Sequence, residues 1–277
     1  MGYGIALHSV VPVRTEAREG AEQSTQMLFN ELCEIIEHSD VSIQHSERWR
    51  YIRLESDGQE GWVDAKMICP MKPEEYKTHK SALKTSAMVA MPMAYAVSEN
   101  NGQTLPLTAG TRLTNYQDGR FEVLGVGFRI DPSMVIVAPV SLSLQTLLEK
   151  TRFFLNVPYL WGGKNAMGMD CSGFTQTVMS LFGKQLLRNA SEQATQGRAI
   201  KDIRKAQVGD LVFFDHYEPR VKSQESRVKI THVGIVIDAE RVIHCSGRVK
   251  VEKLDETGIY STEQGGYTHR LVAIRRL

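Results

Sequence analysis

Short runs of alternating polar and apolar residues dominate the first part of the chain. The run Arg48–Leu54 alternates, Ser56-Asp57-Gly58 is typical of a turn, and Gly61-Trp62-Val63 resumes the alternation. Alternation on both sides of a glycine-bearing turn predicts a β-hairpin. Apolar positions within Glu22–Glu37 recur at helical spacing, so we expect a helical insert there, part of which can be strand. Together these patterns predict a small β-barrel over residues 1–70.

A second group of short strand-like runs follows a polar stretch. Residues 71–84 are mostly charged or polar, which is typical of a connector. Beyond them, the short apolar runs of residues 85–140 are punctuated by Gly102, Gly110 and Gly119. Glycine gives the backbone the freedom that tight turns need. We therefore expect residues 85–140 to form a second small all-β barrel in tandem with the first.

The pattern changes again near Ser141. Ser141 or Ser143 can cap the N-terminus of a helix that runs to about Phe154. A second helix is expected to begin near Cys171, because apolar residues recur at helical spacing from Phe174 to Phe182. The compact strand-like runs that follow are Asp210–Asp215, His232–Ile237, Val242–Ser246 and Leu271–Arg275. Helices followed by an antiparallel sheet predict an α+β domain over residues 141–277.

Composition excludes several classes of protein. The 277 residues include 33 Lys and Arg against 32 Asp and Glu, a balance that argues against a protein dedicated to nucleic acids or anionic membranes. The longest apolar stretch, Ala87–Val97, contains Pro92 and is too short to span a bilayer. The cysteines are widely spaced, which fits a reduced setting. No Lys or Arg precedes the apolar residues of Met1–Val13, so we expect no secretory signal and a cytoplasmic location. The periplasm or envelope would follow if a leader had been removed.

A cysteine and two histidines of the C-terminal part suggest nucleophilic catalysis. Cys171 lies where a loop turns into a helix, and the positive end of a helix is expected to lower the pKa of a thiol. His232 opens an apolar strand and can act as a general base, and His244 can orient it if the next strand pairs with the first. A zinc site made by these three residues is the weaker alternative, because no pair has the close spacing of common zinc motifs. Each residue alone is more often a packed core residue than a catalyst.

Five ordered motifs resemble those of the NlpC/P60 cysteine peptidases. In chain order they are Tyr159-Leu160-Trp161-Gly162-Gly163, Asp170-Cys171-Ser172-Gly173-Phe174, Gly209–Phe214, His232–Ile235 and Ile243–Gly247. Arg188–Gln193 also resembles the family's segment between the catalytic helix and the sheet. The resemblance covers about residues 141–277. It implies a papain-like α+β fold and the hydrolysis of amide bonds in cell-wall peptides, with no cofactor and no metal.

The resemblance also implies a role for each matched catalytic residue. Cys171 would be the nucleophile, His232 the general base and then the general acid, and His244 the orienting third member. Tyr159 would place its hydroxyl near the oxyanion, where it could act together with the backbone N–H of Cys171. The alternative for Tyr159 is a packing aromatic.

Two bacterial SH3-like (SH3b) barrels ahead of such a domain resemble one branch of the family, the γ-D-glutamyl-L-diamino acid endopeptidases, also called dipeptidyl-peptidase VI. This implies a murein tripeptide or tetrapeptide substrate with a free N-terminal L-Ala. The enzyme would cut between γ-D-Glu and diaminopimelate or lysine and release L-Ala-γ-D-Glu in cell-wall peptide recycling. Two alternatives are an endopeptidase on intact peptidoglycan, with the barrels as wall anchors, and a non-catalytic wall-binding module. We expect a monomer with neither nucleic-acid nor membrane partners.

Candidate substrate contacts come from both parts of the chain. Asp170 and Ser172 match positions that contact substrate, and Asp170 would pair with the L-Ala ammonium group. Asp170 can equally cap the helix that begins beside it. Glu22 of the first barrel is the candidate acid that closes the pocket over this amine, or else an exposed surface charge. Trp161 is a further candidate substrate contact, or else a packing aromatic.

Overall fold

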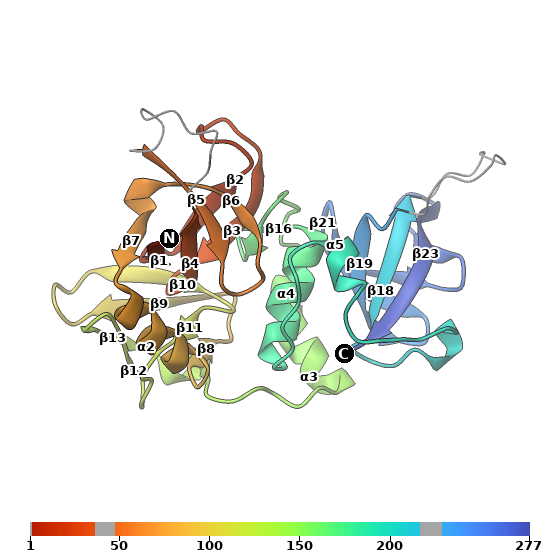
Figure 1. Cartoon of the computed structure of the whole chain (residues 1–277). Helices are drawn as coiled ribbons and strands as arrows, with labels where there is room; N and C mark the ends of the chain where they lie inside the picture. The colour runs from red at the N-terminus through yellow and green to blue at the C-terminus, as the bar shows by residue number, and fades with distance from the viewer. Residues whose placement is uncertain (1, 37–47, 217–228) are drawn as a thin grey trace. The chain divides into compact units, whose positions relative to one another are not determined.

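The computed structural model describes residues 2–36, 48–216 and 229–277, and the chain divides into two compact units (Figure 1). The N-terminal unit comprises Met1–Pro139 together with Trp161–Ala166, and the C-terminal unit comprises Val140–Leu160 and Met167–Leu277. The short segment Trp161–Ala166 therefore belongs to the N-terminal unit, although it lies within the range predicted for the C-terminal domain. Among the described residues, no helix combines the length and the apolar character needed to cross a membrane.

A seven-stranded sheet forms the first part of the N-terminal unit. Its strands are β1 (Gly2–Ala6), β2 (Val10–Arg14), β3 (Gln23–Leu28), β4 (Leu32–Ile36), β5 (Trp49–Leu54), β6 (Glu60–Asp64) and β7 (Ile68–Met71), and a 3₁₀ turn at Ala65–Met67 precedes β7. Their order in the sheet is β3-β2-β6-β5-β4-β1-β7. β5 and β6 are antiparallel neighbours with Ile52 opposite Gly61, which confirms the predicted hairpin.

The helical insert expected at Glu22–Glu37 is wrong over its described residues. This part of the chain is β3 and β4, separated by a turn in which Asn30 has a φ of 71°. Met27 and Leu28 are adjacent in sequence and both buried, so β3 is covered on both faces. A strand with apolar residues on both faces produces pairs of neighbouring apolar positions, which the helical pattern also contains. Glu37 lies outside the described residues.

The second part of the N-terminal unit begins with a helix. The stretch predicted as a connector is mostly α2 (Pro73–Leu83), which Pro73 opens and whose first turn Glu75 caps by accepting a hydrogen bond from the Lys72 N–H. The strands that follow are β8 (Ala87–Val89), β9 (Met93–Ser98), β10 (Thr104–Thr108), β11 (Arg112–Leu113), β12 (Arg120–Val123), β13 (Val126–Ile130) and β14 (Val135–Ile136), with a 3₁₀ turn at Pro132–Met134. They form a four-stranded sheet, β10-β9-β13-β12, and a three-stranded sheet, β11-β8-β14.

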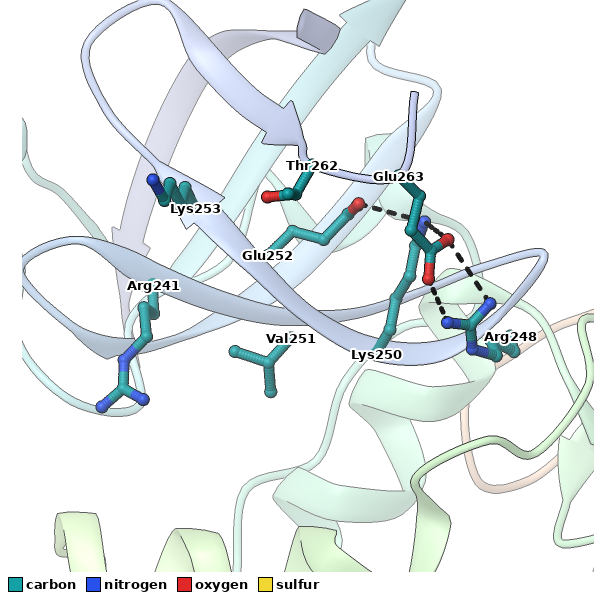
Figure 2. A pocket seen from close by; sticks show the side chains of 8 residues that line it. All are labelled: Arg241, Arg248, Lys250, Val251, Glu252, Lys253, Thr262 and Glu263. Carbon is teal, nitrogen blue, oxygen red and sulfur yellow. Dashed lines mark hydrogen bonds and ion pairs between the residues drawn. The ribbon is translucent and has the colours of Figure 1, made fainter. Parts of the chain in front are cut away.

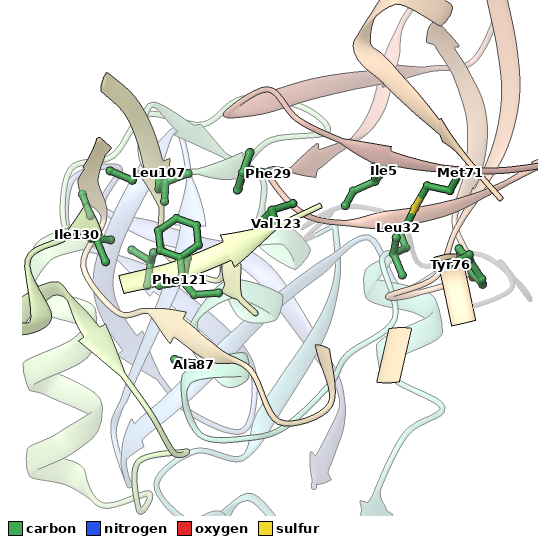
Figure 3. Packing of buried hydrophobic residues seen from close by; sticks show 14 residues of the cluster. Ile5, Phe29, Leu32, Met71, Tyr76, Ala87, Leu107, Phe121, Val123 and Ile130 are labelled. Carbon is green, nitrogen blue, oxygen red and sulfur yellow. The ribbon is translucent and has the colours of Figure 1, made fainter. Parts of the chain in front are cut away.

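One hydrophobic core joins the two parts of the N-terminal unit (Figure 3). Phe29 and Leu32 of the first part belong to the same buried cluster as Leu107, Phe121 and Ile130 of the second. The ring centroids of Phe29 and Phe121 lie 6.5 Å apart in an edge-on arrangement. Shared burial of aromatic surface makes the two parts one compact unit.

The segment Trp161–Ala166, which contains β15 (Lys164–Asn165), is bound to the N-terminal unit by polar contacts. The Lys164 ammonium lies 3.0 Å from a carboxylate oxygen of Glu31, and the side-chain carbonyl of Gln26 accepts a hydrogen bond from the Lys164 N–H at 3.0 Å. Gly162 has a φ of +71°, and a Cβ there would lie 2.4 Å from the carbonyl oxygen of Gln23. Only glycine fits this close approach without strain.

The C-terminal unit contains the predicted helices and a sheet. Its helices are α3 (Leu144–Thr151), α4 (Cys171–Leu181) and α5 (Ala190–Gln193), with 3₁₀ turns at Arg152–Phe154 and Ile203–Lys205. Its strands are β16 (Gly168–Met169), β17 (Arg198–Ala199), β18 (Leu211–His216), β19 (His232–Asp238), β20 (Arg241–Ser246), β21 (Arg248–Leu254), β22 (Gly258–Ser261) and β23 (Gly266–Arg276). Ser143 caps α3 through its side chain, as expected.

The sheet of the C-terminal unit closes on itself. Its order is β17-β23-β18-β19-β20-β21-β22, and β22 pairs again with β23. This closure forms a ring of strands around a core that includes Val212, Phe214, Val236 and Val242. The helix α4 packs against β19 and β20. The start of α4 is thereby held beside the strands that carry the two candidate histidines.

Candidate active site

Cys171 is the first residue of α4, and local interactions hold it at this position. The side chain of Asp170 caps the helix by accepting a hydrogen bond from the Gly173 N–H at 2.7 Å. The Cys171 side chain is buried, and the backbone N–H of Val233 donates a hydrogen bond to its sulfur. Val233 follows His232 directly on β19, so the thiol lies beside the start of that strand.

The two candidate histidines are in direct contact. β19 and β20 are antiparallel neighbours in which Gly234 lies opposite His244. The Nε2 atom of His232 lies 2.8 Å from the Nδ1 atom of His244. A Cβ at position 234 would come within 2.6 Å of Val242 Cγ2 and 3.0 Å of His244 Cβ. Glycine at this position therefore lets the two strands approach as closely as the histidine pair requires.

Two residues that sequence analysis missed complete the surroundings of this pair. The Nε2 atom of His244 lies 2.9 Å from a carboxylate oxygen of Glu252 on β21. The ring of His269 on β23 lies against that of His232, with centroids 4.2 Å apart. For Glu252, the strand-like alternation of residues 248–254 was a signal in the sequence, because a strand places Lys250 and Glu252 on the same face.

Burial shifts the pKa values of both Cys171 and His232. Burial, together with the nearby charge of Asp170, raises the pKa of Cys171 to about 12. Burial also lowers the pKa of His232 well below the usual value, as does the neighbouring His244. The expected lowering of the thiol pKa by the helix N-terminus is therefore wrong, because desolvation of the thiolate outweighs the helix dipole. Both shifts favour the uncharged forms, a neutral Cys171 thiol and a neutral His232 imidazole.

Asp170 has a structural role around the first turn of α4. Its two carboxylate oxygens accept hydrogen bonds from Arg188 at 3.0 and 2.5 Å, and Arg188 is 1% exposed. Arg188 also donates to the Ser172 hydroxyl at 2.8 Å. Gln193 donates to the Ser172 carbonyl, so both ends of the Arg188–Gln193 motif hold this turn. An incoming ammonium group would have to share an Asp170 oxygen with Arg188, and its recognition by Asp170 and Ser172 stays a prediction.

The remaining predicted site residues divide between the units. Tyr159 is half-buried in the C-terminal unit, where burial and the nearby Cys171 raise the pKa of its phenol. A neutral phenol is a hydrogen-bond donor, as the predicted oxyanion contact requires. Glu22 and Trp161 belong to the N-terminal unit, and both side chains are exposed, Trp161 by 59%. Their contact with substrate stays a prediction.

The described part of the structure contains no cluster of side chains that matches the alternative zinc site. Over residues 2–36, 48–216 and 229–277, no three His, Cys, Asp or Glu side chains are arranged to hold a metal ion. The ring nitrogens of His232 and His244 instead contact each other, and the second nitrogen of His244 contacts Glu252. All four cysteines are free thiols.

Comparison with known proteins identifies the two kinds of domain. Residues 156–276 match the model of the NlpC/P60 family. The chain carries an NlpC/P60 domain. Residues 13–68 match the bacterial dipeptidyl-peptidase SH3 domain. An NlpC/P60 domain makes the chain a hydrolase of the peptidase class, and the pair of domains confirms the recognition made from the motifs.

Two curated proteins and one solved structure show how far the similarity extends. The gamma-D-glutamyl-L-lysine dipeptidyl-peptidase of Bacillus subtilis (strain 168) is 28% identical over 91% of this chain and 80% of its own length. The protein of the same name from Bacillus cereus (strain ATCC 10987 / NRS 248) is 34% identical over 35% of this chain and 27% of its own. The crystal structure of an NlpC/P60 family protein from Bacillus cereus ATCC 10987 superposes with a TM-score of 0.78 over 99% of both chains, at 17% identity. This similarity confirms the predicted fold class, an α+β NlpC/P60 domain preceded by an all-β region.

The buried histidines of the NlpC/P60 domain predict a loss of stability in acid. The pKa values of His232, His244 and His269 are all lowered by burial, that of His269 to about 4. The unfolded chain, with histidine pKa values near 6.5, then binds more protons than the folded chain at pH below 6.5. We expect the free energy of unfolding to fall by up to about 1.4 kcal/mol per pH unit for each histidine as the pH drops from 6.5 towards 4.

Urea unfolding between pH 7.5 and 4.5 measures this loss. The variant His269→Gln removes one of the three proton acceptors and should give a shallower pH dependence. Replacing the exposed His8 by glutamine is the matched control and should leave the slope unchanged. Equal slopes in all three proteins would contradict the assignment of the acid sensitivity to the buried cluster.

Proposed function

We propose that the chain is a cysteine peptidase that cuts murein peptides with a free N-terminal L-Ala between γ-D-Glu and diaminopimelate or lysine. The products are L-Ala-γ-D-Glu and a peptide that begins with the diamino acid. The observation that carries the proposal is the placement of the Cys171 thiol at the start of α4 beside β19, whose His232 is hydrogen-bonded to His244. The name of the Bacillus subtilis relative, which matches 91% of this chain, supports the γ-D-glutamyl specificity.

The proposed reaction starts from a neutral Cys171 thiol and a neutral His232 imidazole. His232 accepts the thiol proton as the Cys171 sulfur attacks the γ-carbonyl carbon of D-Glu. The resulting oxyanion receives hydrogen bonds from the Tyr159 hydroxyl and the Cys171 backbone N–H. When the C–N bond breaks, His232 gives its proton to the departing amine and a thioester remains. A water molecule, deprotonated by His232, then attacks the thioester, which releases the new carboxylate and returns the proton to the sulfur.

The biological setting is part of the same proposal. A peptidase that requires a free L-Ala acts on peptides already released from the wall, so we place it in peptide recycling, in the cytoplasm and as a monomer. Its partners would be murein tripeptides and tetrapeptides. An endopeptidase of intact peptidoglycan would instead accept peptides whose N-terminus is blocked.

Mass spectrometry of the products tests the proposal directly. The purified chain is incubated with L-Ala-γ-D-Glu-meso-diaminopimelate and, separately, with the N-acetylated peptide. We expect L-Ala-γ-D-Glu from the free peptide and at least about a 100-fold slower cleavage of the acetylated one, because acetylation removes the positive charge that a carboxylate of the site would recognise. Equal cleavage of both would favour the endopeptidase of intact wall and remove Asp170 and Glu22 from amine recognition. No cleavage of either peptide would overturn the proposed substrate and favour a wall-binding module.

A further inference from the structure

We propose that Glu252, held in place by Lys250, is a positioning residue that sets the tautomers of His244 and His232, so that His232 offers an unprotonated Nδ1 atom to the thiol. The proposal rests on the proposed function, since it assigns a role within that catalytic site. It extends the site from Cys171 and the two histidines to a fourth side chain.

The direction of the hydrogen bonds follows from the chemistry of a carboxylate. An ionised carboxylate only accepts hydrogen bonds, so the His244 Nε2 atom, 2.9 Å from Glu252, carries a proton. A neutral imidazole protonated at Nε2 has a bare Nδ1, and this atom of His244 accepts from the His232 Nε2–H at 2.8 Å. His232 is thereby protonated at Nε2. Its Nδ1 is left bare and is the nitrogen that can take the proton of Cys171.

The surroundings of Glu252 keep it ionised and oriented. Burial by itself would raise the pKa of Glu252, but hydrogen bonds to its carboxylate, that of His244 first, bring it down to about 2. The Lys250 ammonium lies 3.2 Å from the second carboxylate oxygen. In the pairing of β20 and β21, Lys250 lies opposite His244 and Glu252 lies opposite Val242, so both side chains are on the same face as the imidazole. One oxygen thus faces Lys250 and the other faces His244.

Glu252 also lines a pocket of the C-terminal unit. The pocket has a volume of about 280 Å³. Its lining residues, drawn in Figure 2, are Arg241, Arg248, Lys250, Val251, Glu252, Lys253, Thr262 and Glu263. Figure 2 shows Lys250 between the two carboxylates of this pocket, with Glu252 on one side and Glu263 on the other. Glu263 pairs with Arg248 and Lys250 and is 54% exposed, so it shares the pocket but contacts no catalytic imidazole. Glu263 is therefore a matched control for Glu252.

The substitution Glu252→Gln tests the assignment because Lys250 decides how the new amide is oriented, whereas the Ser261 hydroxyl, which also interacts with this carboxylate, can donate or accept. The Lys250 ammonium can only donate, so the amide oxygen turns towards it and the NH₂ group faces His244. His244 must then present a bare Nε2 and a protonated Nδ1, which reverses the hydrogen bond to His232 and places a proton on His232 Nδ1. We expect kcat to fall at least about 100-fold with KM changed less than about threefold, because a base in the wrong tautomer cannot take the thiol proton. Glu263→Gln should keep kcat within about threefold.

A double substitution separates positioning from simple structural damage. In the Glu252→Gln, Lys250→Met variant the amide is free to turn its oxygen towards His244. We expect this double variant to be at least about tenfold more active than Glu252→Gln alone, although it removes one more side chain. Equal or lower activity of the double variant would overturn the proposal, as would a Glu252→Gln enzyme that loses thermal stability but keeps kcat.

Nitrogen-15 NMR of the histidine side chains gives a readout that needs no substrate. In the reduced wild-type protein we expect His244 and His232 to be protonated at Nε2, and in Glu252→Gln both should carry the proton at Nδ1. Unchanged tautomers in the variant would refute the role of Glu252. A wild-type chain that cut neither murein peptide would refute the proposed function, and the NMR result would still decide the tautomer assignment.

Discussion

Replacing Cys171 by alanine is expected to lower kcat/KM for the murein peptide by at least about 10⁴-fold. The variant lacks the only atom at the start of α4 that can form the thioester, and removal of a covalent nucleophile has effects of this size in other hydrolases. The small alanine side chain leaves the Asp170 cap and the packing of α4 intact, so the free energy of unfolding should change little. Product release measured by mass spectrometry over long incubation gives the residual rate.

The matched control is Cys69→Ala, which removes a half-buried thiol of the N-terminal unit and should keep full activity. In the wild-type enzyme, the rate should be constant through neutral pH and fall only at a pH well below 6.5, because the pKa of His232 is lowered and its neutral form is the proposed base. Substantial activity of Cys171→Ala would show that another group attacks the peptide and would refute the cysteine mechanism.

Replacing Arg188 by methionine is expected to destabilise the fold by about 3–5 kcal/mol. Arg188 is almost completely buried, and both of its contacts with Asp170 would be lost. The Asp170 carboxylate would remain buried at the N-terminus of α4 without the guanidinium group that neutralises it. Urea unfolding at pH 7 measures the loss, and hydrolysis should fall with it because the first turn of α4 carries Cys171.

Arg204→Met provides the matched control for this experiment. Arg204 pairs with Asp202 in the same C-terminal unit, but its side chain is 86% exposed, so its loss should cost less than about 1 kcal/mol. The double variant Arg188→Met, Asp170→Asn should recover part of the stability, since it removes the buried negative charge that Arg188 neutralises in the wild-type protein. A loss of stability no larger for Arg188→Met than for Arg204→Met would contradict the structural role of this ion pair.

Local sequence patterns predicted the secondary structure correctly wherever a segment's own residues determine it. The hairpin of β5 and β6 needs only its alternation and its turn, and the α3 helix needs only the Ser143 cap and its apolar spacing. The helix at Cys171 was predicted for the same reason. The five motifs identified the family from short stretches of chain, and the comparisons confirm that family and the fold class.

The pattern of a segment gave a wrong prediction where other segments of the chain bury its side chains. The apolar positions of β3 and β4 fit a helix as well as a strand, and the choice depends on which neighbours cover them. The expectation of a lowered pKa for the Cys171 thiol was wrong for a related reason. A helix N-terminus can be read from the sequence, but the desolvation that outweighs it comes from the packing of α4 on the sheet.

The chain's residues alone were enough to recognise the family and to nominate Cys171, His232 and His244 as the candidate nucleophile, base and orienting residue, because they lie in short motifs whose order is characteristic. How distant segments complete this site is settled by the tertiary fold. Glu252 reaches His244 through the pairing of β20 and β21, and Arg188 reaches Asp170 from beyond the end of α4. Strand register and the burial of charge arise from contacts between distant segments, and a sequence pattern reports only the preferences of neighbouring residues.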